Sequence, residues 1–158
     1  LILTGMESGR SFEESLKEAR RRGIAEANCD YDIDGWDAAV KAVALANVLM
    51  HADSRPFDVD RDGIRNVRVE DIERAARSGM VIRLVARGKR SIDGVKLAVA
   101  PEWVPRNSAL GSVCGTSNAL MLETDLMGEI AILENEPGTG QTAYALLSDM
   151  IQIHEYLA

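Results

Sequence analysis

The segment from Glu26 to Lys41 brings five carboxylates and one lysine together just before an apolar run. Asp37 and Lys41 are four residues apart at the start of an expected helix, so both side chains leave the same helix face. Glu26 lies in the loop before this helix and could fold back toward the pair. An acid and an amine on one helix face, with a second acid nearby, are typical of a cluster that binds a small polar substrate and moves a proton.

A surface ion pair is the alternative explanation for Asp37 and Lys41. Such a pair at helical spacing stabilises a helix by only about 0.3–0.5 kcal/mol and has no chemical role. The rest of the helix is nearly all apolar, which favours a position for these charges at the edge of a cleft. The spacing alone leaves both explanations open.

Aspartates alternate with other residues in two stretches that match the first half of an EF-hand calcium loop: Asp30, Asp32, Asp34 and Gly35, then Asp58, Asp60, Asp62 and Gly63. The loop needs a bidentate glutamate at its twelfth position. That position holds Lys41 in the first stretch and Val69 in the second, and Arg65 stands at the usually apolar eighth position of the second. A lysine ammonium would repel the ion in the first stretch, and the second stretch lacks the twelfth-position carboxylate. We therefore assign no metal site and interpret the second stretch as a solvated acidic turn.

Composition limits the class of protein. The chain has 158 residues, of which 46% are hydrophobic and 27% charged, as in a soluble protein with one α/β or α+β domain. Its net charge of -7 argues against nucleic-acid binding. The absence of a long apolar run or a signal peptide, together with two isolated cysteines, predicts a cytoplasmic protein without membrane contact. The chain begins with Leu1 rather than methionine, which we interpret as a cut in mid-strand from a longer protein.

The first half of the chain is predicted to be helical. Ser11 and Glu14 form a capping box for a helix over residues 11–22. Asp34 is expected to cap a second helix over residues 35–50, whose wide apolar stripe should be largely buried. The next segments are a loop at 51–66, with an extended piece at 57–59, and a short helix at 69–78.

Strand patterns follow in the second half. Alternating and β-branched residues predict strands at 80–86 and 95–100, a loop bracketed by Pro101 and Pro105, and a hairpin of residues 118–123 with 129–134. A last helix is expected at 141–157. The order predicts an α+β fold in which helices cover one face of a mixed, largely antiparallel sheet.

The acidic segment and its flanks resemble the catalytic domain of homoserine dehydrogenase over nearly the whole chain. The most specific part is the spacing of Glu26, Asp34-Gly35, Asp37 and Lys41. Matching positions on either side corroborate it: Gly5 to Gly9, Phe12, Asp32, Leu45-Ala46, Gly115, Asn118-Ala119, Gly138, Gly140, Thr142-Ala143 and Asp149. The glycine turn departs from the family pattern, because only Gln141 separates it from Thr142-Ala143.

The resemblance implies roles for these side chains. Lys41 would donate a proton to the aldehyde oxygen of aspartate semialdehyde as hydride arrives from NAD or NADP. Glu26 and Asp37 would hold the amino and hydroxyl groups of homoserine, and Asp32 belongs to the same substrate-binding group. The substrate expected from the family is therefore a small amino acid.

The resemblance also implies a missing partner domain. Members join an NAD(P)-binding Rossmann domain to the substrate domain, yet no strand followed by a GxGxxG turn occurs in residues 1–158. We therefore expect a single catalytic domain that is inactive alone, with the cofactor bound mainly outside this chain. Gly138 and Gly140, in a turn before a helix, would lie against that cofactor. The family also implies a homodimer formed through the sheet.

Two other functions remain open. Trp36 and the shortened glycine turn are compatible with a related NAD(P)-dependent oxidoreductase acting on another small aldehyde or hydroxy acid. A non-catalytic module for calcium binding or dimerisation is the alternative from a different class.

Calcium titration separates this last alternative from the enzymes. We expect isothermal titration calorimetry to give no tight binding of Ca²⁺, because the twelfth ligand of each loop is missing. Tight binding accompanied by ordering of the acidic segment would contradict the enzyme interpretation of that segment.

Overall fold

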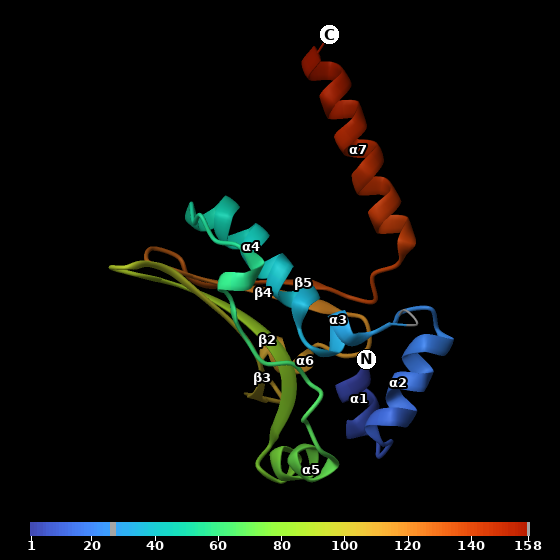
Figure 1. Cartoon of the computed structure of the whole chain (residues 1–158). Coiled ribbons are helices and arrows are strands. Elements are labelled where there is room, and N and C mark those ends of the chain that lie inside the picture. Colours follow the sequence, from blue (N-terminus) through green and yellow to red (C-terminus); the bar gives the residue numbers. More distant parts are fainter. Residues whose placement is uncertain (26–27, 158) are drawn as a thin grey trace. The chain divides into compact units, whose positions relative to one another are not determined.

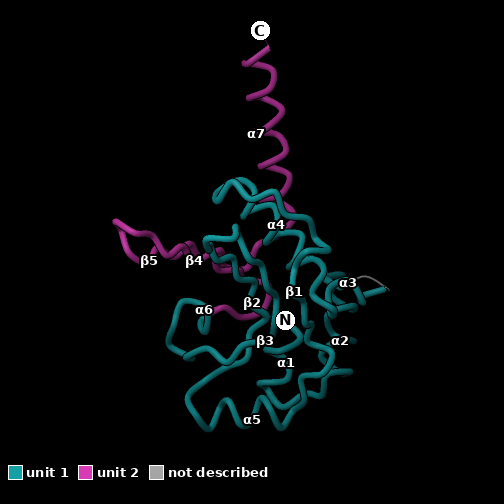
Figure 2. Tube along the Cα trace, turned by 60° about the vertical axis from the view of Figure 1, so that its left-hand side comes forward, with its two compact units in different colours: residues 1–112 teal, residues 113–158 magenta. Residues whose placement is uncertain are grey.

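The computed structural model describes residues 1–25 and 28–157. These residues form two compact units, residues 1–112 and 113–158 (Figure 2). The single-domain expectation for residues 1–158 stays a prediction. The units are described separately.

The first unit contains one three-stranded sheet and most of the helices (Figure 1). Strand order is β1-β3-β2, with β1 parallel to β3 and β2 antiparallel to β3 in a continuous register from Met80 opposite Pro105 to Ser91 opposite Gly94. The elements are α1 (Ile2–Glu7), α2 (Phe12–Arg21), α3 (Asp30–Ile33), α4 (Trp36–Met50), the 3-10 helix η1 (Pro56–Asp58), β1 (Asp60–Arg61), α5 (Val69–Arg77), β2 (Met80–Ser91), β3 (Gly94–Pro105) and α6 (Ala109–Ser112).

The second unit consists of a hairpin and a helix. Strand β4 (Asn118–Thr124) pairs antiparallel with β5 (Gly128–Glu134), and α7 (Thr139–Leu157) follows. The predicted hairpin and final helix are confirmed, although the helix begins two residues earlier than the sequence indicated. The predicted α+β fold is likewise confirmed.

Alternating side chains give the sheet two different faces. Ile82, Leu97 and Val99 share one face, on which Ile82 packs with residues of α1, α2 and α5 and Leu97 and Val99 pack beneath α4. The small residues Ala39, Val43 and Ala46 form the contact surface of α4. Val81, Val85 and Val104 form a separate small cluster with Leu110 of α6. The main core therefore lies between the sheet and the helices α1, α2, α4 and α5.

Of the two N-terminal helices, α2 follows the sequence prediction and α1 does not. Ser11 caps α2 through a complete capping box with Glu14, as predicted. The mid-strand interpretation of the N-terminal residues is wrong, because Ile2–Glu7 is a helix that buries Leu3 and Met6 on one face. Their spacing of three residues fits a helix face rather than a strand.

The predicted burial of α4 is wrong for its bulky residues. Within this chain, Leu45, Val48 and Leu49 are 42%, 73% and 52% exposed, while Ala39 and Ala46 face the sheet. Small residues let the helix approach the strands closely, which leaves the larger ones on the outer side.

Two predictions between the helices and strands also fail. Phe57 lies in η1 rather than in an extended piece, and the extended residues are Asp60–Arg61. Pro101 lies inside β3 opposite Leu84. The Val99 carbonyl accepts a hydrogen bond from the Asp62 amide at the edge of β3 that faces β1. The backbone nitrogen of Pro101, two residues later, faces the same edge, beyond the last residue of β1. A missing N–H is tolerated there because, among the described residues, β1 ends at Arg61 and no strand pairs with β3 beyond it on that side.

None of the helices in the described part of the chain combines the length and the hydropathy needed to cross a lipid bilayer.

A half-buried ion pair fastens α1 to the sheet. Glu7 on α1 pairs with Arg83 on β2, and their side chains are only 15% and 12% exposed. Arg83 also donates through Nη2 to the carbonyl of Gly111 at 3.1 Å. Removing one partner of such a pair leaves a charge without compensation in a poorly solvated place.

We expect Glu7→Gln to lower the free energy of unfolding by about 3 kcal/mol, as measured by urea denaturation. Glu73→Gln is the matched control, because Glu73 and Arg77 form an exposed pair at 3.8 Å and should hardly affect stability. Equal effects of the two substitutions would contradict the structural role of the Glu7–Arg83 pair.

Candidate active site

The candidate site is built around the turn between α3 and α4. Helix α3 ends at Ile33, and Gly35 adopts a left-handed conformation, with φ +77°, before α4 begins at Trp36. A Cβ atom on Gly35 would lie 3.2 Å from Cγ1 of Val99, so both the conformation and the packing require glycine. Gly35, rather than Asp34, is the N-cap of α4 and has no side chain to cap it. The predicted capping role of Asp34 is therefore wrong.

Asp37 and Lys41 meet on the first turns of α4, as their spacing predicted. The Lys41 Nζ atom lies 2.7 Å from Oδ2 of Asp37. The Lys41 side chain is 69% exposed and the Asp37 side chain is 51% exposed, so neither is enclosed within this unit. The pair presents an ammonium and a carboxylate to solvent at one place, and its catalytic role stays a prediction.

The other expected substrate ligands lie on the preceding segment. Asp32 is exposed on α3, which directly precedes the turn. Glu26 lies outside the described residues. The structure thus brings Asp37 and Lys41 together and places Asp32 on the element joined to them through Gly35.

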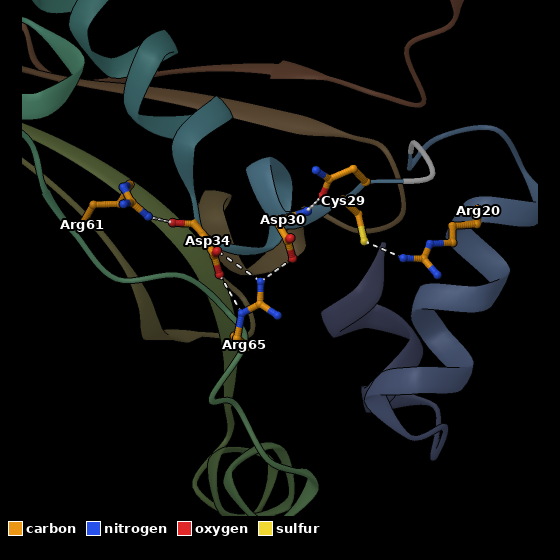
Figure 3. Close-up of polar contacts among 7 residues, drawn as sticks. Arg20, Cys29, Asp30, Asp34, Arg61 and Arg65 are labelled. Atoms are coloured by element: carbon orange, nitrogen blue, oxygen red, sulfur yellow. Dashed lines mark hydrogen bonds and ion pairs between the residues drawn. The ribbon is translucent and has the colours of Figure 1, made fainter.

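Arg65 binds two aspartates of the acidic segment at once (Figure 3). Its Nε atom donates to Oδ1 of Asp34 at 2.8 Å, and its Nη2 atom donates to Asp30 at 2.6 Å. The guanidinium lowers the pKa of the Asp34 carboxyl below its usual value, chiefly by hydrogen bonding. An arginine thus occupies the oxygen atoms that a calcium loop would use for its ion.

Arg61 contacts the same turn from the neighbouring strand. Its Nη1 atom donates to the backbone carbonyl of Asp34 (Figure 3). Its guanidinium carbon also lies 3.8 Å from the centre of the Trp36 ring, a cation–π contact. Phe57 packs edge-on against Trp36 with ring centres 5.3 Å apart. The turn is therefore held at both its backbone and its first helical side chain.

Sequence reasoning missed both arginines as site residues. Arg65 served only as an argument against calcium in its own stretch, whereas it binds the aspartates of the other stretch, 31 and 35 residues away. The one available signal was the excess of carboxylates from Asp30 to Asp37, which indicates that a positively charged side chain from another part of the chain compensates them.

Gly138 and Gly140 belong to the second unit, at the start of α7. The Gly138 amide donates to Oε1 of Gln141 at 2.9 Å, and a Cβ atom on Gly140 would meet no side chain of a residue beyond its neighbours within 4 Å in the described part of the chain. Their contact with a cofactor stays a prediction.

No group of three or more histidine, cysteine, aspartate or glutamate residues within residues 1–25 and 28–157 has a geometry that could hold a metal ion.

Comparison with known proteins gives one consistent family. Residues 1–151 match the family model described as homoserine dehydrogenase. The chain is 35% identical over 155 residues to an NAD(+)-dependent homoserine dehydrogenase of Pseudomonas canavaninivorans, covering 98% of this chain and 44% of that protein. It is 42% identical over 154 residues to a homoserine dehydrogenase of Methanocaldococcus jannaschii, covering 97% and 44%.

Solved structures agree with the sequence comparison. The chain superimposes on the crystal structure of S. aureus homoserine dehydrogenase with a TM-score of 0.91 and 30% identity, covering 99% of this chain and 40% of that one. The homoserine dehydrogenase of Thiobacillus denitrificans gives a TM-score of 0.88 at 31% identity, covering 95% and 35%. The chain thus spans less than half the length of the relatives it matches.

The ion pair of Arg65 makes a prediction for titration. Arg65→Gln should raise the pKa of Asp34 toward its usual value, because the donor that favours the charged carboxylate is lost. The carboxyl-carbon NMR signal of Asp34 measures this directly. Since the folded-state pKa lies below the unfolded one, the pair stabilises the fold at neutral pH, and this contribution disappears as acidification protonates Asp34.

Glu18 provides the internal control for that titration. Arg21 and Arg22 hold its pKa at about 2, mainly through hydrogen bonds, and neither contacts Arg65. The Glu18 titration should not change in the variant, and an unchanged Asp34 titration would contradict the ion pair.

Proposed function

Because this chain belongs to the homoserine dehydrogenase family, we propose that it is the substrate-binding and catalytic domain of an NAD(P)-dependent enzyme that interconverts L-homoserine and L-aspartate 4-semialdehyde. The observation that carries this proposal is the contact between Asp37 and Lys41. Their charged groups lie 2.7 Å apart on the first turns of α4, at the positions where the family resemblance puts a substrate ligand and a proton donor.

Lys41 is the proposed proton donor. Bound NAD(P) supplies or accepts the hydride at the carbon that is an aldehyde in one substrate and an alcohol in the other. In the direction of reduction, negative charge develops on the aldehyde oxygen, and the Lys41 ammonium gives it a proton to form the hydroxyl of homoserine. In the direction of oxidation, the same nitrogen takes the hydroxyl proton.

The carboxylates are proposed to orient the substrate. Asp37 and Asp32 lie on opposite sides of the turn at Gly35, and Glu26 comes shortly before α3 in sequence. Carboxylate oxygens accept hydrogen bonds from the ammonium and the hydroxyl of homoserine. Asp37 also restrains the direction of the Lys41 ammonium through their hydrogen bond. Such orientation brings the reacting atoms together at no further entropic cost.

Most cofactor contacts are proposed to come from residues outside this chain. The chain spans only 44% of the Pseudomonas canavaninivorans relative, whose name includes NAD(+) dependence. Gly138 and Gly140 place small residues at the start of α7, where a cofactor can approach the backbone. We therefore propose NAD or NADP as cofactor and no activity for the isolated chain.

We also propose a homodimer in the cytoplasm. Strand β2 lies at an edge of its sheet, and the β4–β5 hairpin forms a sheet of only two strands, so both leave edges open to pairing within the described residues. Cys29 and Cys114 are free thiols, as in a reducing compartment.

Replacement of Lys41 tests the proposed chemistry. In the protein that carries the nucleotide-binding domain, Lys41→Ala should lower kcat for homoserine oxidation by about 10²- to 10⁴-fold, because the proton transfer loses its partner. Absorbance of the reduced nicotinamide measures the rate, and circular dichroism should show an unchanged fold.

Lys17→Ala is the matched control, since Lys17 is an exposed lysine on the helix α2. Its rate should stay within about twofold of the wild type, as for a surface change away from the site. Equal turnover of the wild type and Lys41→Ala would show that another group donates the proton.

A further inference from the structure

We propose that Arg65, assisted by Arg61, is a positioning residue that holds the α3–α4 turn in the geometry needed to bind homoserine. This inference rests on the proposed function. It assigns a role to a segment that neither contains nor adjoins the predicted catalytic residues in sequence.

The contacts of Arg65 span the substrate-binding segment. Asp30 begins α3, and Asp34 follows its last residue, so the guanidinium connects the two ends of this short helix. Asp32 lies between them. The fork of Arg65 reaches both oxygens of Asp34, Oδ1 at 2.8 Å and Oδ2 at 3.1 Å. A bidentate contact of this kind fixes the orientation of a carboxylate as well as its position.

Arg61 fixes the other side of the turn. It binds the Asp34 carbonyl and covers one face of Trp36, the first residue of α4. Asp37 is the next residue along the helix. Movement of Trp36 would therefore displace the first turn of α4 and with it Asp37 and its contact with Lys41.

The segment that carries both arginines is itself fixed to the sheet. The Asp62 amide donates to the Val99 carbonyl of β3 at 2.7 Å, and the Ile64 amide donates to the Ile33 carbonyl at 2.8 Å. A Cβ on Gly63 would come within 2.2 Å of the Ile33 carbonyl oxygen, so the two backbone segments are in contact and leave no room for a side chain at Gly63. Arg61 and Arg65 thus extend from an anchored segment rather than from a loose loop.

Charge explains why the turn needs these cations. Asp30, Asp32, Asp34 and Asp37 place four carboxylates within eight residues, and their repulsion opposes the folded turn. Arg65 compensates two of them directly. Because Arg65 is half-exposed, its pairs add little to global stability. Their effect should therefore appear in substrate binding and turnover more than in unfolding.

Kinetics of Arg65→Gln in the protein with its nucleotide-binding domain test the proposal. We expect kcat/KM for homoserine to fall about 10- to 100-fold, because displaced ligands no longer align the substrate. KM for the nicotinamide cofactor should change less than about twofold, since the turn contacts the amino-acid substrate alone in this proposal. Arg65→Lys should recover part of the loss, because an ammonium compensates the charge but lacks the planar fork.

Arg21→Gln is the matched control. Arg21 also forms a bidentate pair through Nε and Nη2, with Glu18 at 2.7 and 2.8 Å, and it lies exposed on α2. Its kinetics should equal those of the wild type. An equal loss in Arg21→Gln and Arg65→Gln would overturn the specific role of Arg65.

A double substitution tests whether Arg65 acts through Asp34. If it does, Arg65→Gln combined with Asp34→Asn should lose no more kcat/KM than the worse single variant. Losses that multiply would overturn this connection.

Amide hydrogen exchange in the 158-residue chain separates positioning from a purely structural role. Residues 30–37 should exchange faster in Arg65→Gln than in Arg21→Gln, with the rest of the first unit unchanged. Faster exchange together with unchanged kinetics would overturn the positioning role while leaving the proposed function intact. Absence of homoserine turnover in the wild type would instead reject the proposed function, and the positioning role with it.

Discussion

Close backbone packing between residues 33–35 and residues 61–64 is the constraint on which the first unit depends. Gly63 touches the Ile33 carbonyl where no Cβ could fit, and Gly35 turns the chain with φ +77° against Val99. The first contact joins the α3–α4 turn to the segment that follows β1, and the second places the turn directly against β3. Because α4 starts immediately after Gly35, its direction over the sheet follows from the same contacts, and so does the location of the Asp37–Lys41 pair.

Packing positions α4 at this site, whereas the charged side chains compensate one another and face the solvent. The buried side of α4 is made of small residues that permit close contact with Leu97 and Val99, which fixes the helix axis. The exposed first turns of α4 are then free to present an ammonium and a carboxylate. Arginines from the anchored segment compensate the surplus of negative charge. An exposed Lys41 suits a domain that spans less than half the length of its relatives, in which we propose that residues outside this chain complete the site.

Local signals were enough to predict the elements whose partners are close in sequence. Ser11 and Glu14 cap their own helix, and the β4–β5 hairpin follows from alternating residues around a short turn. Two of the failed predictions, those for Asp34 and Pro101, concern residues whose surroundings are set by distant partners. Asp34 does not cap α4: Gly35 is the N-cap, and the Asp34 carboxylate pairs with Arg65, 31 residues later. Pro101 is tolerated inside β3 because β1 ends before it, which no local pattern shows. The i,i+4 spacing did predict the Asp37–Lys41 contact, whereas Arg61 and Arg65 could not be found without the fold.

Substrate-induced NMR shifts test the central claim most directly. The protein with its nucleotide-binding domain, labelled with ¹⁵N and ¹³C, would be titrated with L-homoserine in the presence of the oxidised nicotinamide cofactor. The proposed site predicts saturable shifts of the Lys41 Nζ signal and of the Asp32 and Asp37 carboxyl signals, with Lys17 unaffected. Saturable binding that leaves Lys41 and Asp37 unshifted, or no binding at all, would contradict the assignment of this site.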